Sequence, residues 1–359
     1  MKIVKAEHWT EPLALLRPYR IAGRTITDIE NHFVRLQADT GICGHGAASP
    51  GDEVTGETLP DCAAALEAHL EACLLGKDLN GFLALIREIR QPLFSRPAAL
   101  AAVEMAILDL VGKGFGLPVV DLFGRRHESL PTSVTIGIQD VSESLREAQE
   151  FIRQGFRILK IKIGDVLEQD IELLRRLRER VGPDIGLRVD GNQGYTPEDL
   201  LAFERQTRDL HLELIEQPLP VGQLESMRTL PDALRAGCAG DESICSPEDA
   251  LLCTHPPQPF GIYNIKLMKC GGIIPALKMA GIARMADIDL MWGCNDESRV
   301  SIAAALHAAM SASATRYLDL DGSFDLGRDL FQEGFCIQNG ELKLTGLPGL
   351  GVSPIEQRE

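Results

Sequence analysis

The sequence predicts an α/β protein in which a parallel (β/α) barrel follows a small α+β domain. Three observations lead to this prediction. From Ser133 to Asp321, short apolar runs alternate with helical patterns, as in repeated strand–helix units. Charged residues recur at the ends of these runs at steps of 25 to 28 residues, about the length of one strand plus one helix. Before Ser133 the pattern differs, with short alternating runs followed by long Ala/Leu-rich segments.

Composition excludes several classes of protein. The net charge is −16, and phosphate binding needs a basic surface, so we expect no nucleic-acid partner. No stretch approaches 18 consecutive apolar residues, so we expect no membrane span. The N-terminal segment lacks the long apolar region of a signal peptide. The nine cysteines form no CxxC pair, which favours reduced thiols and a cytoplasmic protein.

The first 116 residues are predicted to hold a β-hairpin and then helices. Residues 31–49 alternate apolar and polar side chains around the turn Asp39-Thr40-Gly41. Residues 58–76 and 97–116 have apolar side chains at helical spacing, and both segments end at glycine, as helices often do.

Eight strand signals follow, in the segments 133–138, 157–163, 186–192, 212–218, 238–243, 262–268, 289–294 and 316–321. Helical patterns lie between them, for example over 142–154, 168–182 and 299–313. Eight units favour a closed barrel. An open doubly wound sheet is the alternative, but no GxGxxG motif opens any of these helices. Residues 334–352 predict a final hairpin and a Gly/Pro-rich tail that packs on the first domain.

Three carboxylates end successive strand signals: Asp190, Glu216 and Asp241. In a barrel the carboxyl ends of the strands surround one pocket, so these groups would repel one another unless a cation neutralised them. Oxygen ligands of this kind suit Mg²⁺. The alternative is that each acid separately caps the helix that follows it.

Lysines lie on either side of these carboxylates. Lys160 and Lys162 are two residues apart in one strand and therefore share a face. Their mutual repulsion is predicted to lower at least one pKa, which would suit a general base. Lys266 ends the sixth strand, across the barrel from Lys162. Lys269 is expected to turn away from the face of Lys266 while the strand lasts. The alternative for each lysine is a strand end that reaches solvent.

Asp319 and Asp321 end the eighth strand and share a face by the same alternation. No lysine or arginine partner is evident nearby in the sequence. The pair therefore suggests capture of an ammonium group, although an Asp-Gly turn is an equal alternative.

These motifs together resemble the enolase superfamily and, within it, the muconate-lactonizing-enzyme subgroup. They are KxK on strand two, Asp, Glu and Asp on strands three to five, and a lysine on strand six. The resemblance covers nearly the whole chain and implies a modified TIM barrel, (β/α)₇β, with an N-terminal α+β capping domain. We expect the capping domain over residues 1–125, completed by the C-terminal segment 330–359, and the catalytic barrel over 126–329.

The DLDG sequence at the end of strand eight is similar to that of dipeptide epimerases, in which a DxD pair holds the free α-amino group. The resemblance implies a Mg²⁺-dependent isomerase that transfers a proton at the C-terminal residue of an L,L-dipeptide through an enediolate. It also implies that Lys162 and Lys266 act on opposite faces of the α-carbon and that Lys160 assists them. Asp190, Glu216 and Asp241 would bind Mg²⁺, and Asp319 and Asp321 the substrate amine.

Side-chain specificity is expected to depend on segments 20–27 and 50–56, which should close over the barrel. Asp296, together with Asp52 and Glu53, adds negative charge and favours a Lys or Arg side chain. Arg24 favours the competing possibility, an Ala-Glu epimerase.

The nearest competing activities are N-acylamino acid racemase, o-succinylbenzoate synthase and muconate cycloisomerase, which need no ammonium clamp. A catalytically silent barrel that serves as a scaffold is the non-enzymatic possibility. Such a scaffold would have no need for two lysines and three carboxylates at one barrel mouth. We expect a small dipeptide as the partner and a homo-oligomer as the assembly.

Overall fold

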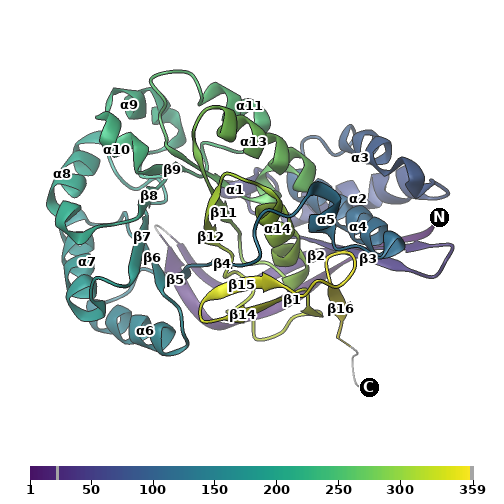
Figure 1. Ribbon diagram of the computed structural model, residues 1–359, viewed down its shortest axis with the longest axis horizontal. Helices are drawn as coiled ribbons and strands as arrows, with labels where there is room; N and C mark the ends of the chain where they lie inside the picture. Colours follow the sequence, from purple (N-terminus) through teal and green to yellow (C-terminus); the bar gives the residue numbers. More distant parts are fainter. Residues whose placement is uncertain (22–23, 356–359) are drawn as a thin grey trace.

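The computed structural model describes residues 1–21 and 24–355, and the side chains of residues 17–25 lie outside this description. A barrel of parallel strands lies beside a cap built from antiparallel strands and helices (Figure 1).

The barrel has eight parallel strands that pair in chain order. They are β5 (Val134–Ile136), β6 (Ile158–Lys162), β7 (Gly186–Asp190), β8 (Leu214–Glu216), β9 (Cys238–Gly240), β10 (Ile262–Ile265), β11 (Asp289–Gly293) and β12 (Thr315–Asp319). The last strand meets the first through a single bridge, Thr132 with Leu318, and through the hydrogen bond from Ser133 N to Leu318 O at 3.1 Å. The predicted barrel is therefore confirmed, and the open doubly wound sheet is wrong.

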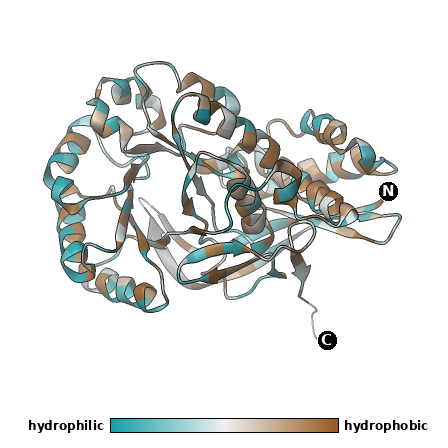
Figure 2. Cartoon of the chain, in the orientation of Figure 1, coloured by the Kyte–Doolittle hydropathy of each residue, from teal (hydrophilic) through white to brown (hydrophobic). Residues whose placement is uncertain are grey.

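Helices connect the barrel strands in order. They are α6 (Val141–Arg153), α7 (Leu167–Val181), α8 (Pro197–Thr207), α9 (Leu224–Thr229), α10 (Asp232–Ala236), α11 (Pro247–Leu252), α12 (Leu267–Cys270), α13 (Ile273–Met285) and α14 (Arg299–Ser311), with 3₁₀ turns at Arg208–Leu210 and Val221–Gln223. The outer helices α6 and α7 carry both hydrophilic and hydrophobic residues, as expected for helices with one face on the strands (Figure 2). No helix follows β12 before the next strand, all of this segment being described, which gives the (β/α)₇β form.

The cap begins with an antiparallel sheet of β1 (Ile3–Ile21), β2 (Arg24–Ala38) and β3 (Cys43–Ala48). The turn between β2 and β3 lies at residues 39–41, as the sequence predicts. The helices that follow are α1 (Asp52–Thr55), α2 (Leu59–Leu74), α3 (Phe82–Arg90), α4 (Pro97–Phe115) and α5 (Val119–Phe123), with a 3₁₀ turn at Leu79–Gly81.

Helix α4 is the central helix of the cap and is buried over most of its length. It packs so closely on β3 that a side chain at two β3 positions would collide with it. A Cβ atom at Gly44 would lie 2.2 Å from Ala106 O, and one at Gly46 would lie 2.0 Å from Ala102 O. Only glycine permits this approach.

Two buried glutamates cap helices that begin without a side-chain cap of their own. Glu57 accepts hydrogen bonds from Ala98 N and Ala99 N at the start of α4. Glu104, within α4, accepts one from Ile274 N at 2.8 Å, at the start of barrel helix α13. Burial raises the pKa of each of these carboxyls to about 7. Glu104 thus links the cap to the barrel.

The C-terminal segment contains the short strands β13 (Phe331–Glu333), β14 (Phe335–Gln338), β15 (Glu341–Leu344) and β16 (Val352–Pro354). Strands β14 and β15 form the predicted hairpin, and β15 pairs with β4 (Leu130–Pro131). The segment also packs on the cap: the Phe331 ring stacks on Phe33, and Leu350 N donates to Asp109 Oδ1 at 2.8 Å. The first and last parts of the chain are therefore neighbours.

The two segments expected to close over the barrel contain regular structure. Residues 24–27 belong to β2, which pairs with the end of β1, so the described part of segment 20–27 is the end of a β-ladder. Segment 50–56 contains the single-turn helix α1, which ends at Gly56 in the left-handed conformation. In the described part of the chain, no helix has the length and hydrophobicity needed to cross a bilayer.

Candidate active site

The candidate site is a cavity of about 1080 Å³ at the carboxyl ends of the barrel strands. Cap residues Asp28, Glu30 and Glu53 line it from one side, and Lys160 and Lys162 from the barrel. The cap is fixed over this opening through the segment after β11, for example by the hydrogen bond from Ser49 Oγ to Asp296 O at 2.8 Å.

The three carboxylates lie side by side at the ends of neighbouring strands. Asp190 and Glu216 end β7 and β8 in register, and Asp241 directly follows β9. Each is at most 1% exposed. Glu216 Oε1 accepts a hydrogen bond from Asn264 Nδ2 at 2.8 Å, and Gln217 Oε1 accepts one from Asp241 N at 2.9 Å, so neighbouring strands fix the row.

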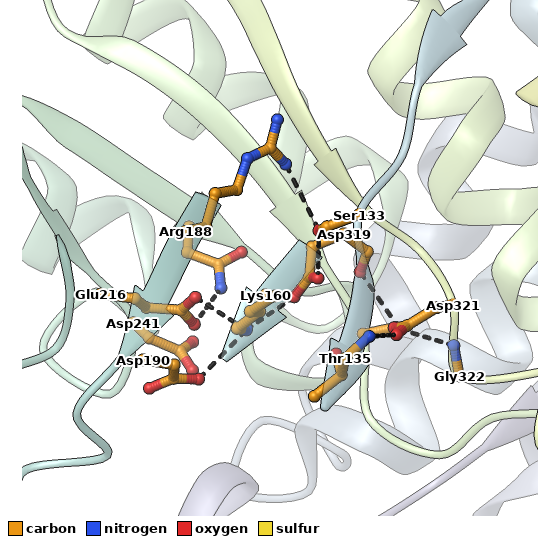
Figure 3. Close-up of polar contacts among 12 residues, drawn as sticks. Ser133, Thr135, Lys160, Arg188, Asp190, Glu216, Asp241, Asp319, Asp321 and Gly322 are labelled. Atoms are coloured by element: carbon orange, nitrogen blue, oxygen red, sulfur yellow. Dashed lines mark hydrogen bonds and ion pairs between the residues drawn. The ribbon is translucent and has the colours of Figure 1, made fainter. Parts of the chain in front are cut away.

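Lys160 lies in the middle of the site (Figure 3). Its Nζ atom lies 2.8 Å from Glu216 Oε2, 3.1 Å from Asp190 Oδ2 and 2.7 Å from Asp319 Oδ2. Burial by itself would lower the pKa of this lysine, but the attraction of the carboxylates, Asp319 first, outweighs burial and raises it. Of the two lysines for which at least one lowered pKa was predicted, Lys160 has a raised pKa, because three carboxylates surround its ammonium group.

Lys162 and Lys266 flank the row of carboxylates. Lys162 Nζ donates to Asp190 Oδ2 at 2.7 Å and to Asn192 Oδ1 at 2.9 Å. Lys266 Nζ lies 2.8 Å from Asp241 Oδ2. Strands β6 and β10 are four positions apart in an eight-stranded barrel, so the two lysines approach the cavity from opposite sides. Burial opposes the charge of Lys266, but Asp241 outweighs it and raises the pKa of the ammonium.

Lys269 lies in this site, although a strand that continued past Lys266 would have turned it off the face of Lys266. Strand β10 ends at Ile265, and α12 forms a single helical turn, which brings Lys269 back to the side of Lys266. Lys269 Nζ contacts Asp241 Oδ1 and donates to Asn264 O at 3.0 Å, and the residue is only 4% exposed. The Gly271-Gly272 pair that ends α12 was the available signal for this turn.

Asp319 and Asp321 both line the cavity, but they do not share a strand face. Strand β12 ends at Asp319, and Asp321 lies beyond it, where its Oδ2 accepts a hydrogen bond from Thr135 N at 2.7 Å. The expectation that the pair has no lysine partner is wrong for Asp319, which pairs with Lys160. Burial raises the pKa of Asp321 to about 7, and the charge of Asp319 adds to the effect.

Arg188 is a buried residue that the sequence patterns did not single out. It lies two residues before Asp190 and is 2% exposed, inside the barrel. Its Nη1 donates to Leu318 O at 2.6 Å and lies 3.4 Å from Ser133 Oγ, and its Nε donates to Glu213 Oε2. The alternation that joined Lys160 to Lys162 would have found it.

The residues expected to recognise a side chain lie at the rim. Asp296 and Glu53 both line the cavity, Glu53 from helix α1. Arg24 begins β2, and its side chain lies outside the described residues.

The row of carboxylates has the chemistry of a divalent-cation site. Within residues 1–21 and 24–355, no three acidic, His or Cys side chains already surround a common point, and Lys160 lies among the carboxylates. The donors nevertheless fit Mg²⁺, because they are buried carboxylate oxygens and the region already attracts a cation. Glu216 Oε2 is buried and accepts no hydrogen bond, although Lys160 Nζ lies near it. Burial, with repulsion from Asp190, raises the pKa of Glu216 to about 8.

Comparison with known proteins places this site in a family. Residues 5–124 match the family described as mandelate racemase / muconate lactonizing enzyme, N-terminal domain, and residues 143–358 match the one described as enolase C-terminal domain-like. A protein from Desulforapulum autotrophicum named L-Lys-D/L-Arg epimerase is 54% identical, over 99% of this chain and 100% of its own. The L-Ala-D/L-Glu epimerase of Bacillus subtilis is 33% identical, over 98% and 97%.

Solved structures agree with this placement. A dipeptide epimerase from Methylococcus capsulatus, solved with Mg and the dipeptide L-Arg-D-Lys, superposes with a TM-score of 0.96. It is 51% identical, and the match covers 98% of this chain and 99% of that one. The chain belongs to the enolase superfamily, in the mandelate racemase / muconate lactonizing enzyme family that contains these epimerases.

Proposed function

We propose that this protein is a Mg²⁺-dependent dipeptide epimerase that inverts the α-carbon of the C-terminal residue, with a preference for a Lys or Arg side chain. The observation that carries the proposal is the placement of Lys162 and Lys266. They reach one cavity from opposite sides of the barrel, with a row of buried carboxylates between them. Inversion of a carbon needs a proton removed from one face and returned to the other.

The lysines divide this work. The lysine that begins as a free amine takes the α-proton, and the opposite lysine, as an ammonium, gives a proton to the other face. Lys160 stays an ammonium in the middle of the site and faces the negative charge that develops on the substrate carboxylate. Because both lysines are on rigid strand ends, their positions relative to the α-carbon are fixed.

Asp190, Glu216 and Asp241 would hold the metal ion. A bound Mg²⁺ supplies positive charge beside the substrate carboxylate and makes the α-proton more acidic. The burial of these residues and their oxygen-only chemistry support this role. Mg²⁺ is also present in the matching structure from Methylococcus capsulatus.

The Asp319–Asp321 segment supplies negative charge for the α-ammonium group of a dipeptide. This separates the proposed reaction from that of N-acylamino acid racemases and o-succinylbenzoate synthases, whose substrates have no ammonium group there. The silent-scaffold possibility is disfavoured because two relatives above 50% identity, which match 98% or more of this chain, are named as epimerases.

The lining of the cavity favours cationic side chains. Beyond the carboxylates already assigned, it includes Asp28, Glu30, Glu53 and Asp296. Two relatives above 50% identity are named L-Lys-D/L-Arg epimerase, which supports the same preference over Ala-Glu.

One experiment tests the reaction and the preference together. The enzyme is incubated with L,L-dipeptides in D₂O with Mg²⁺, and deuterium at the C-terminal α-carbon is measured by mass spectrometry. We expect Xaa-Lys and Xaa-Arg to exchange fastest, N-succinyl-lysine to exchange slowly, and EDTA to stop exchange. Faster exchange of Ala-Glu would overturn the preference, and full activity in excess EDTA would overturn the metal assignment.

Three further features are proposed with this function. The cap over residues 1–125, completed by 330–359, works as a domain distinct from the barrel over 126–329. The nine cysteines are unpaired, which supports a cytoplasmic location.

Met285 is 88% exposed, and Leu251 and Leu252 on neighbouring helix α11 are also exposed, which supports a homo-oligomer. Light scattering would test the last point, and a monomer would contradict it.

A further inference from the structure

The Asp241 carboxylate belongs to the row of three, but its backbone lies outside the strand that leads to it (Figure 3). Asp190 and Glu216 are strand residues and pair with each other in the parallel ladder between β7 and β8. Strand β9 ends at Gly240, so the ladder stops one residue before Asp241. Asp241 is only 1% exposed, and a buried backbone N–H group needs an acceptor. That acceptor has to come from outside the ladder.

The side-chain amide of Gln217 supplies it. Gln217 Oε1 accepts hydrogen bonds from Asp241 N at 2.9 Å and from Ser243 N at 3.1 Å. Gln217 Nε2 donates to Ser243 Oγ at 2.9 Å and to Leu219 O at 2.8 Å. An amide side chain has two donor hydrogens and two acceptor lone pairs, and all of them are used here. One buried side chain therefore holds both ends of segment 241–243.

The backbone of Gln217 is held as firmly as its side chain. Gln217 N donates to Ala239 O in β9, and Gln217 O accepts from Gln193 N in the loop after β7, both at 2.8 Å. The residue has a φ of 31°, in the left-handed region, and Pro218 follows it. Such a backbone costs about 1 to 3 kcal/mol in a residue other than glycine and persists only where its surroundings impose it. Gln217 thus joins the ends of the three strands that lead to the carboxylates.

This connection matters because the carboxylates repel one another. A segment 241–243 that could move would carry Asp241 away from Asp190 and Glu216, and a cation would have to order the segment as it binds. Ordering of this kind subtracts from affinity. Mg²⁺ is especially demanding, since it needs near-ideal octahedral geometry and short distances, whereas Ca²⁺ accepts longer and less regular coordination.

We propose that Gln217 is a positioning residue of the metal site: its amide holds the backbone of Asp241 beyond the end of β9, so that the carboxylate is in place before a cation binds. The inference rests on the Mg²⁺ site of the proposed function and is independent of the substrate. Gln217 and Ser243 are both described residues, and neither lines the cavity. Their replacement should therefore reach the site through Asp241.

Calorimetric titration of the metal-free enzyme with Mg²⁺ and with Ca²⁺, without substrate, tests the proposal. Gln217→Met keeps a long side chain and removes all four hydrogen bonds. It should weaken Mg²⁺ binding by about 10- to 100-fold, the usual effect of losing a group that orients a metal ligand. Ca²⁺ binding should weaken less, so the preference for Mg²⁺ should fall. Exchange of L-Arg-L-Lys in D₂O should recover as Mg²⁺ approaches saturation. Gln332→Met, an exposed site on β13, is the matched control.

Ser243 gives a milder test that keeps the Gln217 side chain. Ser243→Ala removes one hydrogen bond and should weaken Mg²⁺ binding by about two- to tenfold. Ser243→Thr keeps the hydroxyl and should keep the affinity. In the Gln217→Met background, Ser243→Ala should cause no further loss, because the partner of the hydroxyl is already gone.

Unchanged Mg²⁺ affinity in Gln217→Met would overturn the proposal, and so would equal losses for Mg²⁺ and Ca²⁺ or independent effects in the double variant. If circular dichroism shows that Gln217→Met does not fold, the Ser243 pair decides, and equal affinity in Ser243→Ala and wild type would overturn it. A wild-type enzyme that binds no Mg²⁺ would overturn the metal assignment and this inference together. A wild-type enzyme that binds Mg²⁺ but exchanges no dipeptide would overturn the proposed reaction alone.

Discussion

Lys269 Nζ lies 2.5 Å from Asp241 Oδ1, while Lys266 Nζ lies 2.8 Å from the other oxygen of the same carboxylate. Replacing Lys269 by Met removes a buried charge whose partners cannot reach water. We expect Lys269→Met to lower the free energy of unfolding by about 3 to 5 kcal/mol, the usual cost of breaking a buried pair. Mg²⁺ should recover part of this loss, because it supplies positive charge to Asp241.

Thermal unfolding with and without Mg²⁺ measures both effects. Lys343→Met is the matched control, since Lys343 is exposed on β15. An unchanged midpoint in Lys269→Met would show that the contact contributes no stability.

The opposed lysines predict a stereochemical split. In Lys162→Ala only Lys266 can remove an α-proton, and in Lys266→Ala only Lys162 can. Each variant should lose epimerisation by about 10²- to 10⁴-fold, the usual contribution of a positioned base. Each should still exchange the α-proton of one epimer with D₂O, and the two variants should select opposite epimers. Exchange by both variants with the same epimer would place the lysines on one face of the substrate.

The acidic rim predicts a change in substrate preference. Asp296→Asn and Glu53→Gln remove negative charge from the cavity wall without altering its shape. We expect each to lower kcat/KM for Xaa-Lys and Xaa-Arg about tenfold relative to Xaa-Met, because a charge-assisted contact is lost. Glu248→Gln is the control, since this residue is exposed on α11. Equal losses with Xaa-Met would assign these residues to folding or closure and not to specificity.

Glu104 predicts a pH dependence of stability. Burial raises its pKa from 4.5 to about 7, so between these values the folded chain binds a proton that the unfolded chain has lost. This stabilising contribution is fully present below about pH 4.5 and disappears as pH rises through 7. Its full size is about 3 kcal/mol. Glu104→Gln keeps an acceptor for Ile274 N but cannot ionise.

The variant should therefore gain stability relative to wild type as pH rises from about 5 to about 8. Thermal midpoints across this range, with Glu248→Gln as an exposed control, measure the difference. A constant difference between wild type and Glu104→Gln would mean that Glu104 keeps one protonation state throughout.

Residues that end strands were the part of the site most accessible from sequence. Short strand patterns in the sequence are enough to locate the strand ends, and four site residues lie there: Asp190, Glu216, Asp241 and Lys162. In a barrel of parallel strands, all carboxyl ends face the same opening. Lys269 was missed because its position depends on where β10 stops, and a strand boundary is set by packing. Its approach to Asp241 follows from the single helical turn of α12.

The electrostatic predictions depended on partners that the sequence does not reveal. The charge of Lys160 was judged from Lys162 alone, while three carboxylates, of which Asp319 lies 159 residues away in the chain, outweigh burial and raise its pKa. Likewise, Asp319 and Asp321 look alike in DLDG, and only the contacts with Ser133 and Thr135 distinguish them. A pattern of neighbouring residues in the sequence cannot predict contacts between the first and last barrel strands.

The contact between Phe33 and Phe331 has a consequence for how the protein is made. All eight barrel strands lie between these two residues in the chain, and Leu350 must still reach Asp109. The cap therefore cannot be completed until Leu350 has left the ribosome, and its long-range contacts should form slowly. Pulse-labelled hydrogen exchange during refolding should show the local β2–β3 hairpin protected before Leu350 N, which becomes protected only when it reaches Asp109. During synthesis, the catalytic cavity would stay open to solvent until Phe331 and Leu350 pack on the cap and fix it over the barrel.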